Sequence, residues 1–161
     1  QPILMAIVST FSGRLSDRKN PRKLAALGMG ISAVGLLILS FISSETAIIY
    51  ILFGLIILGT GFGLFSSPNT NVVMGSVDKR VYGTASAILA TMRSTGMMFS
   101  MAIASLTIHL FLGDAQINVS NIPQLITSTK IVFALFTVLC FIGVYTSLVK
   151  ANIQIPTLKD E

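Results

Sequence analysis

Four long stretches of this sequence contain almost no charged residue, and this restricts the chain to few kinds of fold. They cover residues 24–42, 46–75, 81–112 and 130–149. Each is long enough to cross a bilayer as a helix, which takes about 20 residues for roughly 30 Å of hydrocarbon. Only 11% of the 161 residues are charged, whereas soluble domains carry about 25% because their surface faces water. The sequence therefore predicts an all-α membrane protein, a polytopic bundle of transmembrane helices.

A fifth apolar stretch, at residues 2–12, is too short to span a bilayer, since an α-helix rises only about 1.5 Å per residue. We expect it to be the end of a helix that begins before Gln1 in a longer protein. Residues 151–161 are more polar and are expected to form a tail outside the membrane. The single cysteine, Cys140, gives no basis for a disulfide or metal framework. We expect neither a metal nor a cofactor.

Basic residues are concentrated in alternate connections between the apolar stretches. Five of the eleven lie in residues 14–23, between the first two apolar stretches. Lys79 and Arg80 lie between the stretches at 46–75 and 81–112. The connections at 43–45 and 113–129 contain none. Basic connections mark the cytoplasmic side of a membrane, so this pattern places 14–23, 79–80 and the C-terminus inside the cell. It also explains the positive net charge without nucleic acid as a partner.

Two stretches resemble a known family. The segment Gly13-Arg-Leu-Ser-Asp-Arg-Lys-Asn-Pro-Arg-Lys23 is similar to the G-x-L-x-D-R-x-x-(basic) motif of the major facilitator superfamily. The segment from Pro68 to Ile103 is similar to the region of the tenth and eleventh helices in the drug:proton antiporter branch, which has twelve or fourteen helices. The resemblance implies that the chain is part of the C-terminal six-helix half, from the end of the eighth helix to the twelfth.

The resemblance also implies roles for residues of the first stretch. In that family the glycine of the motif lets helices cross closely, and the aspartate and basic residues latch the two halves together on the cytoplasmic side. By motif position these roles fall to Gly13, Asp17, Arg18 and Arg22. The family usually has glycine where this chain has Asn20, so the match is weaker at that turn.

The implied activity is secondary transport, with proton-coupled export of hydrophobic small molecules by alternating access. The expected partners are the lipid bilayer, the N-terminal half of the same transporter, a small lipophilic solute and protons. The expected location is the cell membrane, with several passes and a cytoplasmic C-terminus. An alternative is a small multi-helix membrane scaffold or subunit that is complete in itself. An enzyme is not expected, because the chain has no metal-ligand spacing, no paired His and carboxylate and no nucleophile elbow.

Three residues are candidates for the transport path. Arg93 is the only charge deep inside a predicted span, and a central Arg costs about 2.5–3.5 kcal/mol on insertion scales. It should therefore face protein or a water-filled cavity, either in the path or bonded to carbonyls of a neighbouring helix. Asn69 and Asn71 lie near the cytoplasmic end of the span at 46–75, which corresponds to a cavity-lining helix of the family, although a lipid-facing helix would look alike. No Asp or Glu lies within a predicted span, so we expect proton-coupling carboxylates in the N-terminal half.

Overall fold

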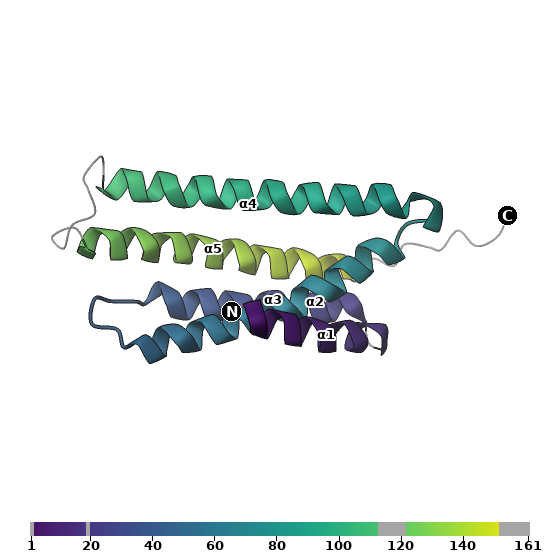
Figure 1. Cartoon of the computed structure of the whole chain (residues 1–161), viewed down its shortest axis with the longest axis horizontal. Helices are drawn as coiled ribbons and strands as arrows, with labels where there is room; N and C mark the ends of the chain where they lie inside the picture. The colour runs from purple at the N-terminus through teal and green to yellow at the C-terminus, as the bar shows by residue number, and fades with distance from the viewer. Residues whose placement is uncertain (1, 19, 113–121, 152–161) are drawn as a thin grey trace.

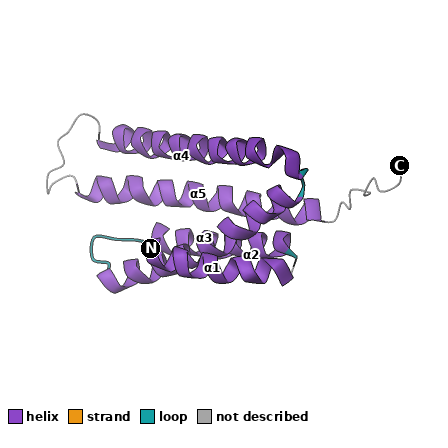
Figure 2. Ribbon diagram, turned by 45° about the vertical axis from the view of Figure 1, so that its right-hand side comes forward, coloured by secondary structure: helices purple, strands orange, loops and turns teal. Residues whose placement is uncertain are grey.

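The computed structural model describes residues 2–18, 20–112 and 122–151, without the side chains of residues 17, 18, 112 and 149–151. These ranges form five α-helices and one short 3-10 helix and contain no strand (Figure 2). The elements are α1 (Pro2–Arg18), α2 (Pro21–Ser40), α3 (Ile48–Gly75), η1 (Lys79–Val81), α4 (Tyr82–Leu112) and α5 (Ile122–Ala151). The predicted all-α fold is confirmed.

Four of these helices are long and apolar enough to cross a bilayer, namely α2, α3, α4 and α5. The bounds of the five α-helices differ from those expected from the sequence mainly at two places. The first helix continues through residues 13–18, and α5 begins at Ile122 instead of near residue 130. Most of the basic connection expected at 14–23 is therefore helical. The expected tail lies outside the described residues beyond Ala151.

The α2 helix contacts both α3 and α5. The α1 helix packs against α3, while α4 lies along α5 at the edge of the bundle (Figure 1). Glycines bring α2 and α3 together: a Cβ atom on Gly28 would lie 2.6 Å from the backbone nitrogen of Phe65. In lipid, such small residues let helix backbones approach closely and gain van der Waals contact.

The α3 helix passes through Pro68 without ending there. Proline has no N–H group, so the helix loses the bond that residue 68 would donate to the carbonyl of Leu64. The hydroxyl of Ser12 in α1 donates a hydrogen bond to that carbonyl, with an oxygen–oxygen distance of 3.2 Å. Pro68 and Ser12 are both almost completely buried. A neighbouring helix thus satisfies the backbone group that proline leaves free, as the bilayer interior requires.

The two basic connections lie at the same end of the bundle. Figure 1 shows the turn between α1 and α2, the η1 turn and the C-terminal end of α5 together at one end, and the turn between α2 and α3 at the other. Lys23 is the last residue of one cluster of basic residues at this end, and Lys79 and Arg80 form the other. This arrangement agrees with the alternation of charge in the sequence. We refer to it below as the basic end.

Candidate functional site

Polar groups meet where the C-terminal half of α1 crosses the C-terminal half of α3. The side-chain amide of Asn71 donates a hydrogen bond to the hydroxyl of Ser16, at 3.2 Å. Ser16 is only 5% exposed. A Cβ atom on Gly13 would lie 2.9 Å from the hydroxyl oxygen of Ser67. Gly13 therefore stands at a close crossing of α1 with α3.

The turn after this crossing is built around Asn20. Its side-chain oxygen accepts a hydrogen bond from the backbone nitrogen of Arg22 at 3.1 Å, and Pro21 begins α2. Asparagine is among the best N-cap residues, and proline suits the first helical position. The backbone of Asn20 has φ −60° and ψ 110°, which any L-residue adopts. Glycine is therefore not needed at this position, where the family usually has it.

The charged residues of the motif are distributed over both sides of this turn. Asp17 and Arg18 lie in the last turn of α1, and their side chains are outside the described part of the structure. Arg22 lies in the first turn of α2, with an exposed side chain. The backbone thus brings these three residues to the basic end of the bundle. Their position there is compatible with contact to another part of a larger protein.

Arg93 lies in the first half of α4, far from both ends of that helix, and its side chain is exposed. Leu89 lies four residues before it and Ser100 seven residues after it, and both are half-buried. Residues at these spacings share one side of a helix. Arg93 therefore belongs to the side on which α4 approaches the rest of the bundle.

Asn69 and Asn71 lie on different sides of α3. Asn71 is bonded to Ser16 of α1, whereas Asn69 is four residues before Val73 and shares its side of the helix. Val73 and Leu89 both line a small apolar hollow of about 190 Å³ between α3 and α4. This volume is below the roughly 300–1,000 Å³ of drug-sized pockets.

The position of the hollow indicates how Asn69 and Arg93 are arranged relative to each other. Asn69 is one helical turn farther from the basic end than Val73, and Arg93 is one turn farther from it than Leu89. Because α3 and α4 run in opposite directions, Asn69 and Arg93 come to a similar depth on the sides of α3 and α4 that border the hollow. Away from the basic end the two helices diverge (Figure 1). An amide and a guanidinium group thus occur at one level, next to a hollow that is lined by apolar side chains.

Sequence reasoning missed Ser12 and Ser16, each of which forms a hydrogen bond with α3. The available signal was their four-residue spacing, which places two small residues on one face of a helix. Gly59 and Gly63 of α3 have the same four-residue spacing. The structure buries both glycines, and a Cβ atom on Gly63 would lie 2.8 Å from the Cβ atom of Val8 in α1.

The chain is similar to a family of transporters along nearly its whole length. The family model described as Major Facilitator Superfamily matches residues 2–157. The uncharacterized transporter YebQ of Escherichia coli K12 is 34% identical over 119 residues, which are 74% of this chain and 26% of that protein.

Two further relatives have names that state what they handle. The riboflavin transporter RibZ of Clostridioides difficile is 22% identical over 142 residues, covering 88% of this chain and 31% of that protein. The multidrug resistance protein Stp of Mycobacterium tuberculosis is 33% identical over 99 residues, covering 62% and 18%. The chain thus spans less than a third of the length of these curated relatives. No solved structure gives a significant match.

Proposed function

The chain belongs to the Major Facilitator Superfamily, and we propose that it forms the C-terminal portion of a secondary transporter that exports small lipophilic solutes in exchange for protons. The observation that carries this proposal is the family match across residues 2–157, combined with four helices that are able to span a membrane. Such transporters work by rocking two helical bundles around a site near the middle of the bilayer. The second bundle belongs to the remainder of the protein.

Arg93 and Asn69 are proposed to line the transport path. Both lie on the sides of α4 and α3 that border the hollow between these helices, and an intramembrane Arg marks a functional position by default. Asn71 contributes indirectly, because its amide is already bonded to Ser16. The surrounding apolar side chains favour a lipophilic solute. The printed name of the relative Stp, a multidrug resistance protein, supports the same class of substrate.

The α1–α2 turn is proposed to form a cytoplasmic gate. Gly13 sets the close crossing of α1 with α3, and Asp17, Arg18 and Arg22 lie beyond it at the basic end. In the outward-facing state these charged residues would contact the other half of the transporter. This proposal places the basic end and the C-terminus in the cytoplasm and the transporter in the cell membrane, as expected from basic connections.

Proton coupling requires a titratable group at membrane depth. The helices α2, α3, α4 and α5 contain no Asp or Glu. We therefore assign the coupling carboxylates to the part of the transporter that precedes this chain. The role of α3 and α4 is then to shape the solute path opposite these carboxylates.

The proposal is tested with the full-length transporter in proteoliposomes under an imposed pH gradient. We expect the gradient to drive accumulation of a lipophilic dye, and a protonophore to abolish it. Riboflavin is the matched second solute, because the relative RibZ is named a riboflavin transporter. Uptake of riboflavin without movement of the dye would replace lipophilic export by vitamin transport. Dye movement that is insensitive to the protonophore would contradict proton coupling.

A further inference from the structure

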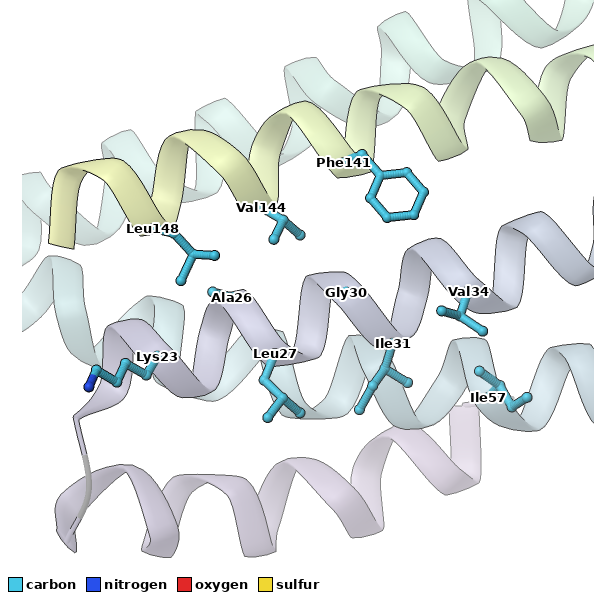
Figure 3. Close-up of a pocket in the computed structure, with 10 residues that line it drawn as sticks. All are labelled: Lys23, Ala26, Leu27, Gly30, Ile31, Val34, Ile57, Phe141, Val144 and Leu148. Atoms are coloured by element: carbon cyan, nitrogen blue, oxygen red, sulfur yellow. The ribbon is translucent and has the colours of Figure 1, made fainter.

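A long apolar groove runs along the contact between α2 and α5. It has a volume of about 800 Å³ and is lined almost entirely by carbon atoms. The α2 helix contributes Lys23, Ala26, Gly30 and Val34, and Figure 3 shows α5 side chains such as Phe141 on the opposite wall. The small residues of α2 create the hollow, since a Cβ atom on Gly30 would meet nothing within 4 Å. Apart from Lys23 at one end, the groove is therefore lined by apolar residues.

The dimensions of the groove match one leaflet of a bilayer. Lys23 lies at the basic end and Val34 lies eleven residues later in the same helix. At about 1.5 Å per residue this separation is about 17 Å. Half of the hydrocarbon core is about 15 Å thick. The groove thus extends from the headgroup level at the basic end to near the middle of the membrane, which is the depth of a single acyl chain.

The positive charge at the mouth of the groove favours lipids with an anionic headgroup. Lys23 stands at this mouth with its long side chain exposed, and Arg22 is the preceding residue of the same turn. Lysine side chains near helix ends extend their ammonium group to the interface. Basic residues between transmembrane helices on the cytoplasmic side bind acidic lipid headgroups. A cationic mouth over an apolar groove complements a molecule with an anionic head and a hydrocarbon tail.

We propose that the α2–α5 groove binds an anionic phospholipid of the leaflet at the basic end, with one acyl chain against Gly30 and the phosphate at Lys23. The bound lipid fills the hollow that the small residues of α2 leave in the outline of the bundle. This lipid is a structural ligand, and its binding does not depend on which solute the transporter moves. A failure of this inference therefore leaves the proposed transport function unaffected.

The test uses the full-length transporter, reconstituted in vesicles of equal parts phosphatidylglycerol and phosphatidylcholine and then extracted in mild detergent. Native mass spectrometry counts the lipids that remain bound. We expect the wild type to retain phosphatidylglycerol over phosphatidylcholine. The substitution Lys23→Gln should lower that preference about fivefold, the factor that one basic residue contributes near an anionic surface. Lys79→Gln, at the same end but outside the groove, should leave it unchanged.

Substitutions that fill the groove distinguish the contribution of the acyl chain to binding from that of the headgroup. Gly30→Leu and Val34→Phe should each remove the retained lipid whatever its headgroup, while Gly30→Ala, which adds a single carbon, should retain it. Equal retention of both lipids by the wild type would overturn the proposal, and so would lipid binding that the filling substitutions leave intact. A lipid-free dimer that Gly30→Leu dissociates would show that a second copy occupies the groove. Absence of any retained lipid would show that another part of the transporter covers it.

Discussion

At the scale of single residues, Gly28 and Gly30 have opposite environments although both belong to α2. A Cβ atom on Gly28 would lie 2.6 Å from a backbone nitrogen of α3, whereas one on Gly30 would meet nothing within 4 Å. Backbone atoms cannot move aside as a flexible side chain can. Gly28 therefore sets the distance between α2 and α3, and Gly30 leaves space at the membrane-facing groove.

This difference predicts opposite effects of the same substitution. Gly28→Ala forces α2 and α3 apart, and overpacking of this kind costs about 1–3 kcal/mol. Gly30→Ala should leave stability unchanged or raise it slightly, because alanine is favoured over glycine in a helix by about 1 kcal/mol. The measurement is the thermal unfolding midpoint of the full-length protein in detergent. Equal midpoints for the two variants would contradict the packing of α2 against α3.

Arg93 offers a second test at the same scale. Arg93→Ala removes the only charge of the α4 span away from its ends, and we expect the transport rate to fall about tenfold or more, equivalent to about 1.4 kcal/mol. Arg93→Lys should retain part of the activity because it keeps the charge. The control is Met98→Ala, since Met98 is exposed on another side of the same helix. Normal transport by Arg93→Ala at normal expression would exclude Arg93 from the path.

At the scale of helices, hydropathy was sufficient to predict the four spans but not their bounds. The first turns of α5 contain Thr127, Ser128 and Thr129, which made this segment look like part of a polar loop. In the structure their hydroxyl groups donate to carbonyls of the preceding turn, at 2.8–2.9 Å. Hydroxyls bonded in this way are compatible with a helix. Composition alone does not reveal this, because the same residues also favour turns.

The candidate site was also predictable only in part from the sequence. The motif indicated that Gly13 stands at a helix crossing and that charged residues follow it. The partner of Gly13, and the bond from Ser12 to Leu64, depend on which residues of α3 face α1. That register is set by packing between segments about 50 residues apart in the chain, because Asn71 is 55 residues from its partner Ser16. Local pattern does not contain this information.

The bond from Ser12 to the carbonyl of Leu64 predicts a coupling between two helices. Ser12→Ala leaves that carbonyl without its partner, and side-chain hydrogen bonds in membranes contribute about 0.6–2 kcal/mol. In a Pro68→Ala background the helix regains its own N–H donor to Leu64, so Ser12→Ala should cost almost nothing. A double-mutant cycle of unfolding free energies measures this difference. The same cost of Ser12→Ala in both backgrounds would show that proline and serine are independent.

At the scale of the whole molecule, burial is distributed unevenly over the spans. The most apolar window of α2 is 39% buried, while that of α4 is not buried at all. The α4 helix bears Arg93 and needs further protein around it, since an intramembrane Arg faces a bundle interior. The relatives supply a reason, because the chain covers only 18–31% of their lengths. We therefore expect the rest of the transporter to pack around α4, whose most apolar window this chain leaves unburied.

The central claim is that four helices cross a membrane with both basic connections on the cytoplasmic side. The direct test is labelling of the full-length transporter, in a Cys140→Ser background, with a membrane-impermeant maleimide. Cysteines are placed singly at Asn20, Lys79 and Ser44, which are all exposed. We predict that the cysteine at position 44 reacts in intact cells, while those at 20 and 79 react only after permeabilisation. Reaction of the cysteines at 20 and 79 from opposite sides of the membrane would contradict the claim.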